Sequence, residues 1–205
     1  MDDKEIKVIL LGNSGVGKTS LINICVPEGY DKEQENVPTL SSYYVQKKVK
    51  IDNKSYILNL WDTAGQETYL GITKLFFKGS EIVIFVYDIS AEYSFRDLSK
   101  WIQMTEEIID NKHICAIIGN KNDLYLEAKI KENEGKQLAE SKQFKFKLVS
   151  AKFDPKVFNE FLLELVREYK DQLDNGENVR RKSMRLKKKD NLDKEEEKSR
   201  KKCCS

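Results

Sequence analysis

The sequence predicts an α/β fold in which a mostly parallel sheet lies between two layers of helices. Three short apolar runs, IKVILL (6–11), EIVIFVY (81–87) and ICAIIG (114–119), alternate with segments of helical periodicity. Runs that are almost wholly apolar are typical of strands buried on both faces, as in a sheet covered by helices. At 205 residues the chain is long enough for one such domain with a modest appendage.

Two more strands and two helices follow from periodicity. The runs 42–51 and 54–61 alternate around Asp52-Asn53, a pair that favours a hairpin turn. A helix is expected over 95–110, where apolar residues share one face. A last helix carries six residues at helical spacing, Phe158, Phe161, Leu162, Leu165, Val166 and Tyr169. Gly176 is expected to end both this helix and the folded part.

Cysteine and histidine counts exclude several classes of protein. Four cysteines, at 25, 115, 203 and 204, are too few and too scattered for a disulfide framework, and no spacing suggests zinc. The single histidine, His113, excludes catalytic triads and His-metal sites by count. The first residues lack the basic and apolar regions of a signal peptide, and no apolar run approaches a membrane span. We therefore expect a protein made and kept in a reducing compartment, the cytosol, unless something is added to it.

Charge divides the chain into an acidic domain and a basic tail. The formal net charge is +2, but residues 175–205 carry +6 and residues 1–174 carry −4. The tail has almost no apolar residues to bury, so we expect a domain over 1–174 and a disordered basic tail over 175–205. A nucleic-acid arm is the alternative, but the EEE run at 195–197 and the lack of interleaved aromatic residues argue against it. No nucleic-acid partner is expected.

The segment GNSGVGKT (12–19) fits the phosphate-binding pattern G-x-x-x-x-G-K-[ST]. It lies directly after the first apolar run and before a helical stretch. Its glycines let backbone N–H groups turn inward as a nest for phosphate. Lys18 would reach the β- and γ-phosphates, and Thr19 would offer its hydroxyl to Mg²⁺. A glycine-rich turn with an accidental lysine is the alternative for this segment alone, and kinases and ATPases share the motif.

A second motif, NKND (120–123), indicates which base is bound. It follows the apolar run 114–119, at the end of a strand, where α/β sheets hold their ligands. A fixed carboxylate accepts two N–H bonds from guanine N1 and N2, whereas adenine offers no donor at those positions. Asp123 therefore indicates guanine. Taken alone, this tetrapeptide is more often an ordinary polar turn.

A third motif, WDTAGQE (61–67), carries groups suited to a γ-phosphate. It follows the run 54–61. Asp62 is placed to hold Mg²⁺ through its hydration shell, and the N–H of Gly65 can approach the phosphate. Gln66 can orient the attacking water.

A fourth motif, SAK (150–152), follows the run 144–149, where a backbone N–H of Ala151 can meet the guanine carbonyl. With four motifs in this order, each after an expected strand, the sequence resembles the Ras-like small GTPases over about residues 5–173. The resemblance implies a three-layer P-loop G domain with a six-stranded mixed, mostly parallel sheet and five helices. It also implies binding of GTP and GDP with Mg²⁺, and two switch loops that order around the γ-phosphate.

Matching the family position by position implies a set of contact residues. Tyr30 looks like the aromatic residue that packs on guanine, and Thr39 looks like the switch threonine that completes the Mg²⁺ shell with Thr19 and Asp62. Gln66 is the implied catalytic residue. The implied nucleotide-binding residues are Ser14, Gly15, Val16, Gly17, Lys18, Thr19, Ser20, Tyr30, Thr39, Gly65, Asn120, Lys121, Asp123, Ser150, Ala151 and Lys152.

Within this superfamily the chain looks most like a Rab. The stretch 61–90 follows the Rab pattern through the second switch and the next strand, and EGKQLAE is Rab-like as well. Two features depart from the pattern. Leu40 and Ser41 stand where Rabs usually have Ile-Gly, and the loop from Lys18 to Thr39 is about two residues longer than usual. Both lie in the loop that effectors contact, so partners of better-known Rabs do not transfer.

The cysteine pair Cys203-Cys204 resembles the Rab signal for double geranylgeranylation. The fourth residue from the end is Lys202, so a CaaX box is not supported. One lipid chain holds a membrane only marginally, whereas two chains with basic residues make a stable anchor. The basic residues of 180–189 and 198–202 would each add roughly 1 kcal/mol of attraction near an anionic leaflet. Two unmodified cysteines are the alternative.

The distribution of arginine bears on catalysis. No arginine precedes Arg96, so neither switch loop carries a residue able to act as an arginine finger in cis. Such a finger is worth about 10³ to 10⁵ in rate. We therefore expect slow GTP hydrolysis and dependence on an activating protein that supplies arginine in trans.

The resemblance also implies the other partners of a Rab-like switch. They are an exchange factor, an activating protein, effectors and a GDI-like escort that binds the prenyl groups. The implied location is the cytoplasmic face of an endomembrane, in exchange with the cytosol, for a monomer acting in vesicle traffic. Three alternatives stay open: a GTP-binding scaffold that does not hydrolyse, a Ras- or Rho-type signalling GTPase, and a P-loop kinase, for which no acceptor site or arginine-rich lid is evident.

Overall fold

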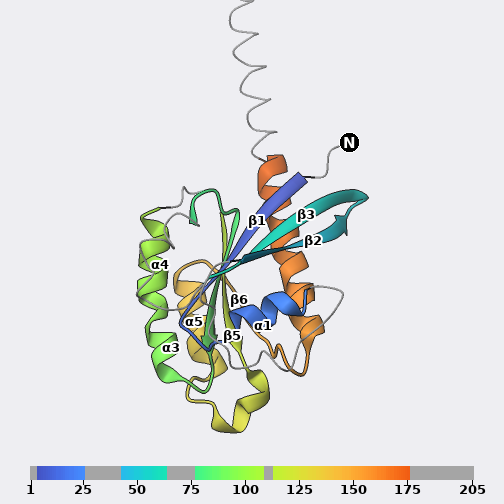
Figure 1. Ribbon diagram of the computed structural model, residues 1–205. Coiled ribbons are helices and arrows are strands. Elements are labelled where there is room, and N and C mark those ends of the chain that lie inside the picture. Colours follow the sequence, from blue (N-terminus) through green and yellow to red (C-terminus); the bar gives the residue numbers. More distant parts are fainter. Residues whose placement is uncertain (1–3, 26–42, 64–76, 109–112, 176–205) are drawn as a thin grey trace, which may run out of the picture. The chain divides into compact units, whose positions relative to one another are not determined.

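A computed structural model describes residues 4–25, 43–63, 77–108 and 113–175, and it confirms the predicted fold class. One six-stranded sheet has the strand order β2-β3-β1-β4-β5-β6 (Figure 1). The strands are β1 (Lys4–Leu11), β2 (Tyr43–Ile51), β3 (Lys54–Asp62), β4 (Ile82–Asp88), β5 (Ile114–Asn120) and β6 (Lys145–Leu148). Every neighbouring pair is parallel except β2 and β3, so the sheet is mixed and mostly parallel.

The antiparallel pair is the predicted hairpin. Asp52 and Asn53 form its two-residue turn, with φ of 48° and 64°. Positive φ at both central positions is the type I′ geometry, whose twist matches that of the flanking strands, and Asp and Asn tolerate it better than most residues. The turn fixes the register in which Ile51 lies opposite Lys54 and Tyr43 opposite Asp62.

Five α-helical segments and one 3-10 helix lie within the described residues. They are α1 (Lys18–Asn23), α3 (Glu92–Arg96), α4 (Leu98–Glu106), η3 (Asn122–Glu127), α5 (Glu132–Ser141) and the segment 155–175. None of the helices in the described ranges is both long and apolar enough to cross a membrane.

Alternate side chains of the central strands bury into two helical layers. Leu11, Phe85 and Ile117 lie in one cluster with residues of α4 and α5. The neighbouring positions, such as Leu10 and Ile84, are also fully buried and point to the other face. Figure 1 shows α1 and the segment 155–167 on the opposite side of the sheet from α3 and α4. Burial on both faces explains why these strands are almost wholly apolar.

The helix expected over 95–110 differs in the structure. α3 ends at Arg96 and α4 begins at Leu98, and Asp97 separates them although its backbone is still helical. The Asp97 carbonyl accepts a hydrogen bond from the Lys100 N–H at 3.0 Å and a longer one from the Trp101 N–H at 3.4 Å. The bond from Lys100 is of the 3-10 type. The bond from Trp101 and the bond from the Asp97 N–H to the Tyr93 carbonyl, at 3.0 Å, are of the α-helical type, so Asp97 is a turn between two helices that stay connected by hydrogen bonds. Residues 109 and 110 lie outside the described residues.

The chain divides into two compact units, Met1–Arg167 and Glu168–Ser205. The division falls within the helical segment 155–175. Six residues of this segment are predicted to share one face, and the five of them that lie in the first unit, from Phe158 to Val166, are all buried. The domain boundary between residues 174 and 175 stays a prediction, and Gly176 lies outside the described residues.

Five parallel strands end at one edge of the sheet. The strands β1, β3, β4, β5 and β6 run in the same direction, so their carboxyl ends meet there, toward the bottom of Figure 1. The segment 12–19, called the P-loop below, follows β1, and SAK follows β6. Asp62 and Asp88 end β3 and β4, and NKND begins at the end of β5. The topology therefore brings segments distant in sequence to one place.

Candidate nucleotide-binding site

The P-loop folds back on its own lysine. The Lys18 ammonium donates to the backbone carbonyls of Gly12 at 2.8 Å and Asn13 at 2.9 Å. The side chain is buried, with 5% of its surface exposed. This burial lowers the pKa of Lys18 from 10.5 to about 8, and the nearby Asp62 carboxylate acts in the opposite direction. The loop therefore holds a cation with two carbonyl partners, ready for an anionic ligand.

Thr19 and Asp62 bring two oxygen groups together from α1 and β3. The Thr19 hydroxyl donates to Asp62 Oδ2 at 2.7 Å. Asp62 is fully buried, and Thr19 is partly exposed. A hydroxyl and a carboxylate are hard oxygen donors, and Mg²⁺ typically takes one or two protein ligands beside phosphates and water. The two groups thus fit a magnesium ion. Among the residues with described positions, no cluster of three His, Cys, Asp or Glu side chains offers another metal site.

Asn120 joins three of the four motifs. Its side-chain amide donates to the Val16 carbonyl of the P-loop at 2.8 Å, and its Oδ1 accepts from the Ala151 N–H at 3.3 Å. Gly17 lies against this amide with φ of +94°, and a Cβ there would lie far inside van der Waals contact with Asn120 Nδ2. The sequence therefore needs glycine at this position for two reasons, backbone conformation and space.

Asp123 and Ser150 connect NKND to SAK. The Ser150 hydroxyl donates to Asp123 Oδ1 at 2.5 Å and accepts from the Phe153 N–H at 3.1 Å. Ser150 is buried, whereas Asp123 is partly exposed. A hydroxyl that is held by a backbone donor and points at a carboxylate fixes the direction of that carboxylate.

These motifs coincide with a known family. The model of the Ras family matches residues 7–171, which is most of the chain. The chain belongs to the Ras family of small GTPases. Its similarity is to Rab proteins within that family. It is 38% identical to the Ras-related protein Rab-11B of Dictyostelium discoideum over 71% of this chain and 65% of that protein, just under two thirds of its length.

Two mammalian Rab proteins are similar over a larger part of their length. The Ras-related protein Rab-17 of Mus musculus is 34% identical over 80% of this chain and 78% of its own. The Ras-related protein Rab-22A of Canis lupus familiaris is 34% identical over 80% of this chain and 83% of its own. The resemblance to Rab proteins is therefore confirmed at the level of sequence similarity.

One polar residue of this small GTPase was missed by sequence reasoning. Asp88, at the end of β4, is buried and forms an ion pair with Lys121 of NKND, with 2.8 Å between Oδ2 and Nζ. Its Oδ1 accepts from both the N–H and the hydroxyl of Ser90, at 2.8 and 2.7 Å. The backbone of Lys121 is in the left-handed region, with φ of 63°. The available signal was the position of Asp88, a charged residue directly after a buried strand, as Asp62 is.

The remaining predicted site residues have different locations. Ser14, Gly15 and Lys152 are exposed, and Ser20 is partly exposed near the start of α1. Tyr30, Thr39, Gly65 and Gln66 lie outside the described residues, as do the lipidation candidates Cys203 and Cys204. The roles of all these residues stay predictions.

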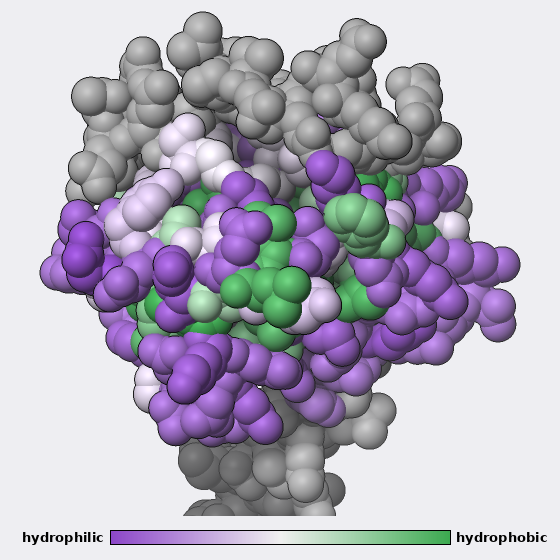
Figure 2. Space-filling view, turned by 90° about the horizontal axis from the view of Figure 1, so that it is seen from below, coloured by the Kyte–Doolittle hydropathy of each residue, from purple (hydrophilic) through white to green (hydrophobic). Residues whose placement is uncertain are grey.

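Figure 2 views this Ras-family protein from below. Apolar groups gather in the middle of a largely hydrophilic face. In the described chain, the large exposed apolar residues of η3 and of the loop after SAK are Tyr125, Leu126 and Phe153, and Leu126 is the most exposed at 85%. Polar and apolar groups therefore both occur near the ends of β5 and β6.

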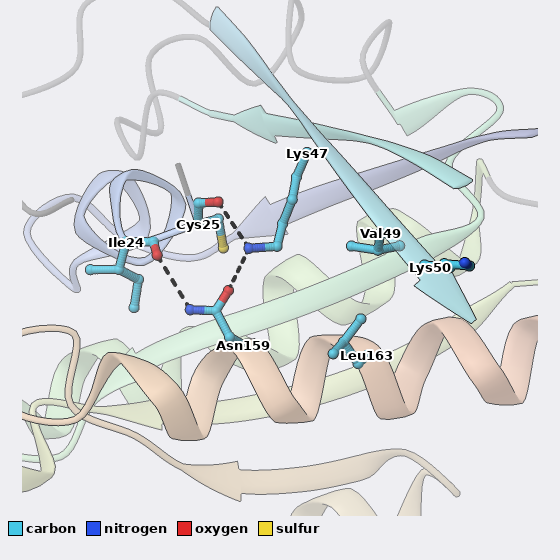
Figure 3. A pocket seen from close by; sticks show the side chains of 7 residues that line it. All are labelled: Ile24, Cys25, Lys47, Val49, Lys50, Asn159 and Leu163. Carbon is cyan, nitrogen blue, oxygen red and sulfur yellow. Dashed lines mark hydrogen bonds between the residues drawn. The ribbon is translucent and has the colours of Figure 1, made fainter. Parts of the chain in front are cut away.

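A hollow of about 390 Å³ lies elsewhere, between the end of α1, β2 and the segment 155–167 (Figure 3). Lys47 reaches across it and donates to the Cys25 carbonyl at 2.9 Å and to Asn159 Oδ1 at 2.8 Å. The Asn159 amide donates in turn to the Ile24 carbonyl at 3.3 Å. This hollow contains none of the predicted nucleotide contacts. Its hydrogen bonds connect Ile24 and Cys25, the two residues after α1, to β2 and the segment 155–167.

Proposed function

We propose that this chain is a Rab-like molecular switch that binds GTP and GDP with Mg²⁺ and hydrolyses GTP to GDP. The observation that carries the proposal is the hydrogen-bonded connection of four separate motifs at one edge of the sheet. Asn120 joins the P-loop to SAK, Ser150 joins SAK to NKND, and Thr19 joins the P-loop to Asp62. Membership of the Ras family agrees with this proposal.

Base recognition is assigned to Asp123. Its carboxylate accepts the N1 and N2 protons of guanine, and the hydroxyl of Ser150 keeps it oriented. On nucleotide binding, the Ala151 N–H would turn from Asn120 Oδ1, its acceptor at 3.3 Å, to the guanine carbonyl. Tyr30 packs on the ring. A site that recognises a base by hydrogen bonds discriminates against a base that lacks the matching donors, because binding that base would leave the acceptors of the site unpaired.

Phosphate binding is assigned to the P-loop. Lys18 contacts the β- and γ-phosphates, and backbone N–H groups of residues 14–20 surround them. Loss of water around a buried ammonium strengthens its attraction to a phosphate. The two carbonyls that hold Lys18 keep its head aimed without neutralising it.

Thr19 and Asp62, together with Thr39, are the residues that would hold Mg²⁺. A bound Mg²⁺ neutralises the charge that develops between the β- and γ-phosphates. Asp62 accepts the hydrogen bond of Thr19 and so aligns that hydroxyl. Gly65 approaches the γ-phosphate through its N–H, and Gln66 orients the attacking water.

Hydrolysis by the chain alone should be slow, because no arginine precedes Arg96. Single-turnover decay of bound GTP, compared between the wild type and Gln66→Leu, tests the assignment. We expect a slow wild-type rate, a lower rate in the variant, and acceleration of the wild type by a cognate activating protein. Equal rates in both proteins would leave Gln66 without a role and favour a GTP-binding scaffold.

The cycle of a Rab-like switch also needs a membrane and partners. We infer that Cys203 and Cys204 carry prenyl groups and that the basic residues before them add attraction to an anionic leaflet. The protein then works on the cytoplasmic face of an endomembrane in vesicle traffic. An exchange factor, an activating protein, effectors and a GDI-like escort act on it.

The double variant Cys203→Ser, Cys204→Ser tests the anchor directly. Imaging of tagged proteins should place the wild type on membranes and the variant in the cytosol, with GDP affinity unchanged. Equal membrane localisation of both proteins would refute the lipid anchor and leave the nucleotide site untouched.

A further inference from the structure

The P-loop residue Asn13 is held from outside the loop by the turn that begins α4. Its Oδ1 accepts from the indole N–H of Trp101 at 2.9 Å, and its Nδ2 donates to Asp97 Oδ2 at 2.7 Å. Asn13 and Trp101 are buried. These partners are 88 and 84 residues away in sequence. The oxygen and the nitrogen of the Asn13 amide are therefore both hydrogen-bonded to residues at the start of α4.

The backbone of the same residue holds Lys18. The Asn13 carbonyl accepts from the Lys18 ammonium at 2.9 Å, beside the Gly12 carbonyl at 2.8 Å. Because the side-chain amide is fixed at both ends, rotation of the Asn13 backbone would break a buried hydrogen bond. The direction of the Asn13 carbonyl, which accepts from the Lys18 ammonium, is thus coupled to the position of α4.

We propose that Asn13 is a positioning residue for Lys18, through which Asp97 and Trp101 of the α4 region hold the phosphate-binding loop in its binding geometry. The inference rests on the proposed function, since it assigns Lys18 to the phosphates. Asn13 itself makes no contact with the base in this assignment. Its effect should therefore appear in the part of the affinity that the β-phosphate provides.

The charge on Asp97 agrees with this arrangement. The hydrogen bond from Asn13, and then that from Lys100, lower the pKa of the Asp97 carboxyl below its ordinary value. Lys100 is largely exposed and lies 2.9 Å from Asp97 Oδ1. Asn13 therefore faces an ionised carboxylate on one side and an indole donor on the other, which suits an amide and not a second carboxylate.

A reciprocal exchange of the two side chains provides the test. In Asn13→Asp, the new carboxylate still accepts from Trp101 but lies against the carboxylate of Asp97. In Asp97→Asn, the new amide can still accept from Asn13. In the double variant Asn13→Asp, Asp97→Asn, the amide introduced at position 97 would donate to the carboxylate introduced at position 13. Trp101 keeps its acceptor, so both hydrogen bonds are restored.

Dissociation constants for GDP and GMP with Mg²⁺, measured on the full chain, give the result. We expect Asn13→Asp to weaken GDP binding about tenfold or more, Asp97→Asn about threefold or less, and the double variant to return to within about threefold of the wild type. GMP lacks the β-phosphate, so its weaker binding should change little. Melting curves accompany each protein, because a general loss of stability would weaken the binding of GDP and GMP alike.

Two results would overturn the inference. The first is a ratio of GDP affinity to GMP affinity in Asn13→Asp that equals the wild-type ratio. The second is a double variant that binds GDP as weakly as Asn13→Asp does. If the wild type itself does not bind GDP, the proposed function fails. If the wild type binds GDP and the variants bind it equally well, only the role of Asn13 is refuted.

Discussion

Ser150 donates a hydrogen bond to Asp123 at 2.5 Å, although 27 residues separate the two in sequence. The hydroxyl is itself held by the Phe153 N–H at 3.1 Å. The carboxylate that we assign to guanine is therefore oriented by a second motif. Removing the hydroxyl should leave the carboxylate present but less well directed.

Ser150→Ala should weaken GDP binding about tenfold, since hydrogen bonds to charged groups contribute roughly 1.5 to 3 kcal/mol. Preference for guanine over adenine should persist, because Asp123 remains. Titration calorimetry measures both properties. Ser141→Ala is the matched control, since its hydroxyl donates to a helix carbonyl, Leu138, at an exposed position. Equal affinity in the Ser150 variant and the wild type would contradict the orienting role.

Gly17→Ala should abolish tight nucleotide binding, because a Cβ at this position would collide with the Asn120 amide. Gly79→Ala is a close control. Gly79 has a similar φ of +75°, and a Cβ there would meet nothing within 4 Å. Both variants should lose about 1 kcal/mol of unfolding free energy or more from backbone strain. If binding assays found the two variants equally competent for GDP, the contact with Asn120 would not matter.

Asp88→Asn should speed GDP release, because Lys121 loses a buried ionised partner. The variant keeps an acceptor for Ser90, so local folding should survive. Lys121 is partly exposed, which limits the effect to about three- to tenfold. Stopped-flow release of a fluorescent GDP measures it. Glu106→Gln, which removes an exposed pair with Lys142, should leave the release rate unchanged. An unchanged rate in Asp88→Asn would remove this residue from the site.

Cys25 and Cys115 should resist thiol reagents at pH 8. Burial raises the pKa of each thiol from 9.0 to about 12, so about one molecule in 10⁴ carries the reactive thiolate at each position. In the Cys203→Ser, Cys204→Ser variant, Cys25 and Cys115 are the only thiols left to react with the reagent. Reaction should appear as the chain unfolds in urea. Fast labelling of the folded variant would show that the two thiols are not protected.

The same pKa shift makes a prediction about stability at alkaline pH. The unfolded thiol ionises near pH 9 and the folded Cys25 near 12, so the folded state holds the proton longer. Its contribution to stability is complete below pH 9 and is lost as the pH rises toward 12. Between pH 8 and 10 the wild type should therefore lose about 1 kcal/mol more unfolding free energy than Cys25→Ala. Urea titrations at the two pH values measure this difference, and equal losses would contradict it.

Local patterns predicted most of the fold, because strands and turns depend on neighbouring residues. The apolar run 114–119 became β5, and Asp52-Asn53 became the hairpin turn. The helix expected over 95–110 was interrupted at Asp97. Periodicity did not reveal this turn, whose carboxylate contacts the P-loop, because the partner residue is 84 positions away.

The candidate site shows the same limit. Motif spacing pointed to Lys18, Thr19, Asp62 and Asp123, and the structure places these residues at one edge of the sheet. Asp88 belongs to no motif. Its place at the site depends on the register that pairs β4 with β5, in which it lies opposite Asn120. Contacts of this kind depend on strand order, which a single sequence does not state directly.

Calorimetry of the purified chain with Mg²⁺, using GDP, ADP and the variant Asp123→Ala, tests the central claim most directly. We predict tight binding of GDP and binding of ADP weaker by about 10⁴-fold or more, as for sites that read a base by hydrogen bonds. Asp123→Ala should lose most of this preference. Equal affinity of the wild type for GDP and ADP, or no binding of either, would contradict the account.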